Sequence, residues 1–143
     1  MVEIITENSI RNLVKRYFII ISVITFISIL TFNVIKEGAY AESELLKTKA
    51  QAVTMSIYIK NINLLPIKVE CLAHQEIVKT IQRVEVNTKL HAASVTTYNR
   101  ESNKRILVIV QIDEEPFKTV IFHKMTFEKI NGEWLIVNFE VDV

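Results

Sequence analysis

YFIIISVITFISILTFNVI, residues 17–35, is the stretch that decides the fold, because it runs for 19 residues without a charged side chain. At about 1.5 Å of rise per residue, a helix of this length reaches about 28 Å, close to the roughly 30 Å hydrocarbon thickness of a bilayer. We therefore expect residues 17–35 to form a transmembrane helix or a signal segment, with residues 1–16 as a leader before it.

The charges on either side of this stretch predict its orientation. Arg11, Lys15 and Arg16 precede it, whereas Lys36 beside Glu37 follows it. Basic residues next to a membrane segment are enriched on the cytoplasmic side. We expect the N-terminus in the cytoplasm, and residues 43–143 outside it as a single folded domain.

Residues 36–42 form the expected juxtamembrane region and leave two alternatives open. Ala39 and Ala41 give the small-x-small pattern of a signal-peptidase site, so cleavage after Ala41 would yield a secreted domain. Against cleavage, the apolar run is longer than the 7–15 residues typical of a signal sequence, which favours a retained anchor and a cell-membrane protein.

Two amphipathic helices are expected after residue 43. The first has apolar residues at helical spacing and ends before Pro66; its stripe is Leu46, Ala50, Val53 and Ile57. The second follows Pro66, and its apolar stripe is Val69, Leu72, Ala73, Ile77, Thr80, Ile81 and Val84.

The pattern then changes to the two-residue period of β-strands. We expect four strands, at residues 90–98, 105–112, 118–129 and 133–141, with a polar turn at 99–104 and a solvated acidic turn at 113–116. Asn131-Gly132 predicts a tight antiparallel hairpin between the last two strands. In the last strand, the face made of Leu135, Val137, Phe139 and Val141 is expected in the core. The predicted fold class is α+β, with two helices packed on a curved antiparallel sheet.

Composition argues against several classes of function. From Glu42 onward there are 13 Lys or Arg and 13 Asp or Glu residues, so no nucleic-acid partner is indicated. Cys71 is the only cysteine, and the three histidines are widely separated, so we expect no metal site. With two glycines in the chain, phosphate-binding glycine loops are excluded, and we expect no cofactor and no catalytic motif.

The tail from Met125 to Phe139 resembles a known family. Its pattern Phe-x-Lys-x-Asn-Gly-x-Trp-x-Ile is similar to the closing hairpin of nuclear-transport-factor-2-like domains, a cone-shaped fold shared with ketosteroid isomerase and polyketide cyclases. One membrane helix followed by such a domain is similar to the bitopic scaffold subunits of type IV secretion and conjugation machines. The resemblance implies a bacterial envelope protein that contacts other envelope proteins or itself and is not an enzyme.

The cone of this fold also implies a place for a small molecule. An apolar pocket lined by Phe117, Phe122, His123, Met125 and Phe127 would make the domain a secreted module that binds a small molecule. A small lyase or isomerase is a further alternative, for which the acid–base candidates are His91, Tyr98, Asp113 and His123. No partner carboxylate is placed beside His123 by the sequence, so a structural histidine is favoured.

Overall fold

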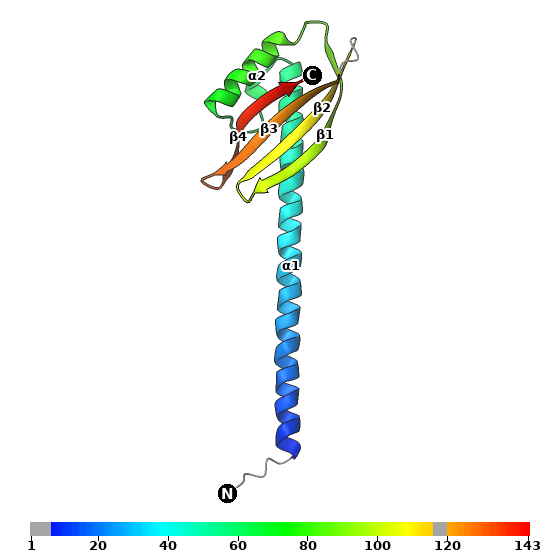
Figure 1. Cartoon of the computed structure of the whole chain (residues 1–143), viewed down its shortest axis with the longest axis vertical. Coiled ribbons are helices and arrows are strands. Elements are labelled where there is room, and N and C mark those ends of the chain that lie inside the picture. Colours follow the sequence, from blue (N-terminus) through cyan, green and yellow to red (C-terminus); the bar gives the residue numbers. More distant parts are fainter. Residues whose placement is uncertain (1–6, 116–119) are drawn as a thin grey trace. The chain divides into compact units, whose positions relative to one another are not determined.

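A computed structural model describes residues 7–115 and 120–143, and Figure 1 shows the order of the elements. The fold is α+β, as the sequence predicts. The elements are α1 (Glu7–Tyr58), a short 3-10 helix η1 (Ile62–Leu64), α2 (Cys71–Arg83), β1 (Lys89–Ser102), β2 (Arg105–Glu115), β3 (Val120–Ile130) and β4 (Glu133–Asp142). The chain divides into two compact units, residues 1–42 and 43–143.

In the first unit, α1 presents apolar side chains that remain exposed. The large apolar side chains of residues 17–35 are 49% to 73% exposed. The hydroxyl groups of Thr25, Ser28 and Thr31 donate to the carbonyl four residues earlier at 2.9–3.0 Å, which satisfies them without water. Residues 36–42 are also helical, because this segment contains no proline and Gly38 is its one weak helix former.

The end of α1 has a specific stop signal. Lys60 adopts a left-handed backbone with φ of 56°. The N–H of Lys60 then donates to the carbonyl of Ile57, and the N–H of Asn61 donates to that of Ser56. This pair of bonds is the Schellman motif, which satisfies carbonyls that the helix itself leaves unpaired. The helix therefore ends before Pro66, as predicted.

The core of residues 43–143 lies between the helices and one face of the sheet. The predicted stripe of α1, namely Leu46, Ala50, Val53 and Ile57, is fully buried. It packs with Ala73 and Ile77 of α2 against the buried face of the sheet, which contributes Ile106, Val108, Val110, Ile112, Met125, Phe127, Ile136 and Phe139. One exception to the predicted stripes is Leu72, which is 72% exposed because the buried face of α2 is centred on Ala73, Ile77 and Thr80.

The four strands lie in the order β1-β2-β3-β4, each antiparallel to its neighbour (Figure 1). The hairpin between β3 and β4 turns at Asn131 and Gly132, whose φ values of 52° and 85° confirm the predicted tight turn. The register of β1 against β2 shifts at three places. Bulges of this kind increase the local twist and bend of a strand.

Two strands are longer than the sequence predicts. β1 continues to Ser102, which pairs with Arg105, so the predicted polar turn at 99–104 is reduced to two residues. β2 continues through Glu115, so the predicted acidic turn is largely strand. Polar residues continue both strands because backbone pairing, rather than burial of side chains, holds their ends.

The predicted core face of β4 is wrong except at Phe139, since Leu135 and Val137 are half-buried and Val141 is 40% exposed. Ile136 is fully buried, and Phe139 is 1% exposed, although an unbroken two-residue period would place them on opposite faces. The pairing explains this, since Phe127 faces Ile136 whereas Thr126 faces Asn138. Val137 is the extra residue of a bulge, and the bulge turns both Ile136 and Phe139 toward the helices.

Candidate functional site

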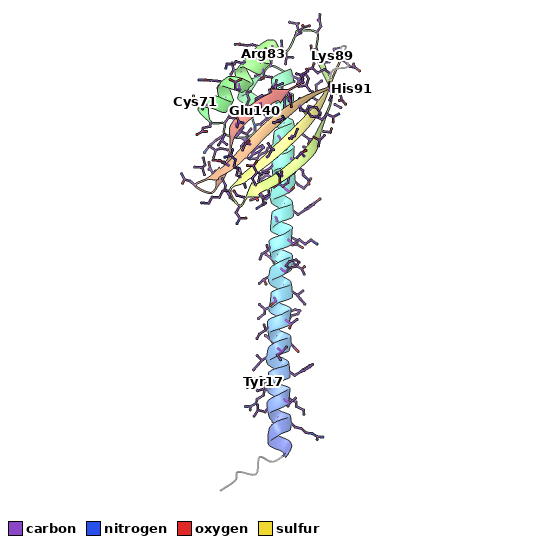
Figure 2. All side chains as sticks on the ribbon, in the orientation of Figure 1. Tyr17, Cys71, Arg83, Lys89, His91 and Glu140 are labelled. Atoms are coloured by element: carbon purple, nitrogen blue, oxygen red, sulfur yellow. The ribbon has the colours of Figure 1, made fainter. Side chains whose placement is uncertain are left out.

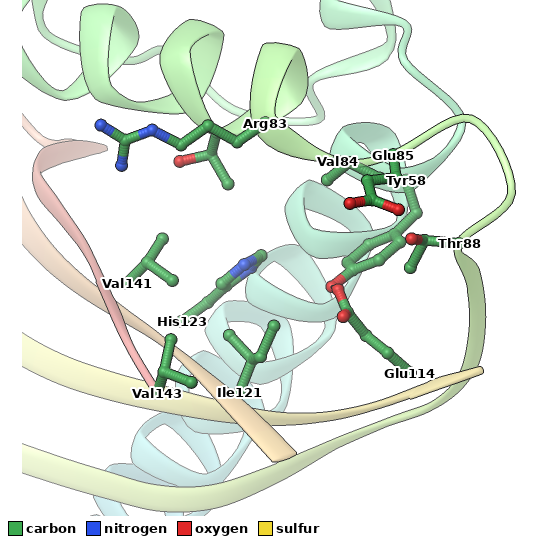
Figure 3. A pocket seen from close by; sticks show the side chains of 11 residues that line it. Tyr58, Arg83, Val84, Glu85, Thr88, Glu114, Ile121, His123, Val141 and Val143 are labelled. Carbon is green, nitrogen blue, oxygen red and sulfur yellow. The ribbon is translucent and has the colours of Figure 1, made fainter. Parts of the chain in front are cut away.

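A pocket of about 350 Å³ opens where the helices meet one end of the sheet. Figure 3 shows that its side chains come from the ends of several elements and from the segment after α2. The pocket is lined by Tyr58, Thr80, Arg83, Val84, Glu85, Thr88, Glu114, Ile121, His123, Val141 and Val143.

Tyr58 and Glu114 form the main polar contact of this pocket. The hydroxyl of Tyr58, at the last turn of α1, donates to the carboxylate of Glu114 near the end of β2 (Figure 3). Burial and, next, this hydrogen bond raise the pKa of Tyr58 well above its ordinary value. Tyr58 therefore stays protonated at physiological pH and acts as a hydrogen-bond donor rather than as a base.

His123 lies at the base of the pocket and is 1% exposed. Its Nδ1 is 3.2 Å from the hydroxyl of Thr54, and its ring meets the ring of Phe139 edge-on at 5.1 Å. Burial lowers the pKa of His123 to about 4. The imidazole is therefore neutral at physiological pH, and its hydrogen bond with Thr54 satisfies one ring nitrogen inside the core.

The remaining walls are mixed in character. Val84, Ile121, Val141 and Val143 supply apolar surface, and the exposed side chain of Arg83 lies at the rim (Figure 3). A pocket with apolar walls and a few fixed hydrogen-bonding groups is suited to binding a small molecule. Near neutral pH the hydroxyl of Tyr58 is protonated and the ring of His123 is neutral, so both are uncharged hydrogen-bonding groups in the pocket.

The structure places the residues proposed from the sequence in different surroundings. His123 lines the pocket, whereas Met125 and Phe127 are fully buried core residues. Phe122 is half-buried on the opposite face of β3, because neighbouring residues of a strand alternate between faces. Phe117 lies outside the described residues.

The other acid–base candidates lie away from His123. His91 is on β1, where its Nδ1 is 3.3 Å from the carboxylate of Glu115, and both side chains are exposed. Asp113 accepts a hydrogen bond of 3.3 Å from the side chain of Gln111. The hydroxyl of Tyr98 is buried, and no hydrogen-bond partner for it lies among the residues that the structure describes.

The remaining sequence candidates lie on helices. Cys71 is exposed at the start of α2 (Figure 2). Ala39 and Ala41 lie inside α1, so a peptidase would have to unwind the helix to reach the bond after Ala41. Within residues 7–115 and 120–143, no group of three or more His, Cys, Asp or Glu side chains is arranged to hold a metal ion.

Sequence reasoning missed Tyr58, Glu114 and Arg83 as pocket residues. Thr54 and Tyr58 carried a weak signal, since both lie beside the apolar stripe of α1 and add polar groups next to a buried face. Glu114 gave no such signal, because its partner lies 56 residues earlier in the chain.

Comparison with known protein families, with curated proteins and with solved structures finds no match to this chain.

Proposed function

We propose that this protein is a single-pass membrane protein whose domain of residues 43–143 lies outside the cytoplasm and binds other envelope proteins. Residues 17–35 are the proposed anchor, and a secretion or conjugation assembly of the type IV kind is the proposed setting. The domain acts through its surfaces and not through catalysis.

The observation that carries this proposal is the exposure of the apolar helix. An 18-residue window of α1 reaches a mean hydropathy of 2.5, and none of that window is buried inside the protein. Apolar side chains that no protein atoms cover are expected to lie in lipid, because exposing them to water costs about 25 cal/mol for each Å². The basic residues Arg11, Lys15 and Arg16 support the cytoplasmic position of the N-terminus.

The interior of the domain supports a role in interaction over catalysis. Met125, Phe127 and Phe139 fill the space between the sheet and the helices, so the centre of the domain is a packed core. Exposed apolar side chains on the domain, among them Ile59 at 58% and Leu64 at 55%, are available for contacts with other proteins.

The test of this proposal uses the mass, location and labelling of the full chain. Membranes from expressing bacteria are expected to retain an intact protein of 16.5 kDa. Cys71 is exposed and is the only cysteine, so a maleimide that cannot cross the inner membrane is expected to label it from the periplasmic side. A soluble product that begins at Glu42 would overturn the anchor, and labelling only after lysis of the inner membrane would overturn the orientation.

A second candidate function, the binding of an apolar small molecule, is favoured by the 350 Å³ pocket. Its test is titration of the domain with an environment-sensitive apolar dye, in wild type and in Val141→Trp. Val141 lines the pocket and is 40% exposed, so an indole there fills the pocket without disturbing the core. Loss of dye binding in this variant is expected, whereas unchanged binding would place the dye elsewhere.

A further inference from the structure

The part of α1 that belongs to the domain has two stripes of uncharged side chains on different faces. The buried stripe packs against the sheet, as described above. The outer stripe faces away from it and consists of Leu45, Thr48, Ala52, Met55 and Ile59, the residue that follows the helix. Leu45 is 50% exposed, Met55 53% and Ile59 58%. In the part of the chain that the structure describes, the large side chains of the outer stripe therefore remain open to an occupant.

The spacing of the outer stripe is that of a coiled coil. Its residues follow one another at steps of three, four, three and four, so they occupy the first and fourth positions of a seven-residue repeat. An amphipathic helix of a globular domain needs only one apolar face, which α1 already buries against the sheet. A second uncharged stripe with this repeat is typical of a helix that pairs with another helix.

The same repeat continues toward the N-terminus in the sequence. When the same steps of three and four are counted back from Leu45 to Ile10, none of the positions reached carries a charged residue. The positions are Ile10, Leu13, Tyr17, Ile20, Ile24, Ile27, Thr31, Val34, Gly38 and Ala41. The charged residues of α1 between Ile10 and Ile59 all fall at other positions of the repeat.

We propose that two copies of this chain associate in parallel through the outer stripe. A repeat of this kind is complementary to itself, since the stripe of one helix fits the same stripe of an identical parallel helix. The parallel orientation rests on the proposed function, because two chains anchored in one membrane with the same topology present their helices side by side and in register. Confinement to one membrane also raises the effective concentration of the two stripes.

The charged residues closest to Leu45 and Thr48 of the outer stripe are complementary to those of a second, parallel copy of the chain. Glu44 precedes Leu45 and Lys49 follows Thr48, so in a parallel pair Glu44 of one chain faces Lys49 of the partner subunit. Glu44 is available on the surface, where its side chain is 48% exposed and paired with Lys47 of its own helix. Glu37 and Glu42 would also face each other, and this like-charge pair opposes association.

Small residues in and next to the outer stripe allow a close approach of the helices. Apart from its chain neighbours and the backbone of its own helix, no described atom lies within 4 Å of the position that a Cβ atom at Gly38 would take, so its surface is open. Ala52 adds little side-chain volume within the outer stripe, and Ala41 occupies the next position of the same repeat in the sequence. Helices with small residues at their contact can pack with backbones close together, both in water and in lipid.

Cysteine cross-linking of the full chain in membranes tests the proposal. Cys71 is replaced by Ser and Thr48→Cys is introduced, so that the only thiol lies in the outer stripe. The matched control is the natural chain, whose exposed Cys71 lies on α2, away from the stripe. Mild oxidation is expected to give a disulfide-linked dimer on the order of tenfold faster with Thr48→Cys than with the natural chain. Equal rates would show random collision and overturn the proposal.

A second pair of variants measures the association without a cross-link. Met55→Lys places a charge in the outer stripe, whereas Leu72→Lys places one at an exposed apolar residue outside it. In the purified chain in detergent, Met55→Lys is expected to weaken dimerisation about tenfold or more, and Leu72→Lys is expected to leave it unchanged. A chain that remains in the membrane but is monomeric overturns the dimer alone, whereas a chain that leaves the membrane overturns the anchor.

Discussion

Acidification from pH 7 to pH 4 is expected to destabilise the domain through His123. Burial lowers the pKa of this histidine to about 4, whereas in the unfolded chain it has the ordinary value of 6.5. Between these two values the unfolded chain binds a proton that the folded domain does not bind. The contribution of neutral His123 to the free energy of unfolding is therefore complete above about pH 6.5. It is lost as the pH falls from about 6.5 to about 4.

The size of the loss follows from the two pKa values. At pH 5 the folded domain is less stable by about 2 kcal/mol, and at pH 4 by about 3 kcal/mol, than it would be with an untitratable residue in place of His123. Domains of this size have a total stability of roughly 5–15 kcal/mol, so the effect is large enough to measure. Other groups that titrate between pH 7 and 4 add their own contributions, and a control variant is needed to separate them.

The assay is urea unfolding of a fragment that begins at Ser43, followed by the fluorescence of Trp134, the single tryptophan. This fragment contains all of the buried apolar core described above. The control is His123→Asn, whose amide reaches the hydroxyl of Thr54 but does not titrate. The variant is expected to be less stable at pH 7 and to lose less stability on acidification. Equal losses in the two proteins would refute the reasoning that burial holds His123 neutral.

Five further substitutions test single features by the same unfolding assay. Tyr58→Phe removes the donor to Glu114 and is expected to lower the free energy of unfolding by about 1–2 kcal/mol. Tyr98→Phe removes a buried hydroxyl without a partner among the described residues and is expected to raise the free energy of unfolding by up to about 1 kcal/mol. The reverse order would contradict both assignments. Phe127→Ala is expected to cost about 3–5 kcal/mol, and Leu72→Ala about 0.5 kcal/mol or less, because Phe127 is fully buried and Leu72 is 72% exposed. Similar costs for these two would reject the assigned core. Gly132→Ala is expected to cost about 1 kcal/mol from its φ of 85° alone, since apart from its chain neighbours no described atom lies within 4 Å of the added methyl group. An unchanged stability would argue against the left-handed turn.

The parts of the fold that the sequence predicts are those in which the signal is local. The helical period alone predicts the buried stripe of α1, and Asn131-Gly132 alone predicts the β3–β4 hairpin. The ends of β1 and β2 could not be predicted, because they depend on partners in the neighbouring strand rather than on the residues themselves. The contact between Tyr58 and Glu114 joins residues 56 positions apart, which no local pattern reports.

The bulge at Val137 could not be predicted from the sequence, and it helps to position the side chains of the pocket. It turns Ile136 and Phe139 to the same face of β4, and the ring of Phe139 then packs edge-on against His123 at the base of the pocket. Ile136 also pairs through its backbone with Lys68 and Glu70, which fixes the chain just before α2. Because α2 carries Arg83 to the rim, one extra residue in β4 positions both the base and the rim of the pocket. A regular strand would turn Asn138 toward the core in place of Phe139, and His123 at the base of the pocket would lose the aromatic ring that packs against it.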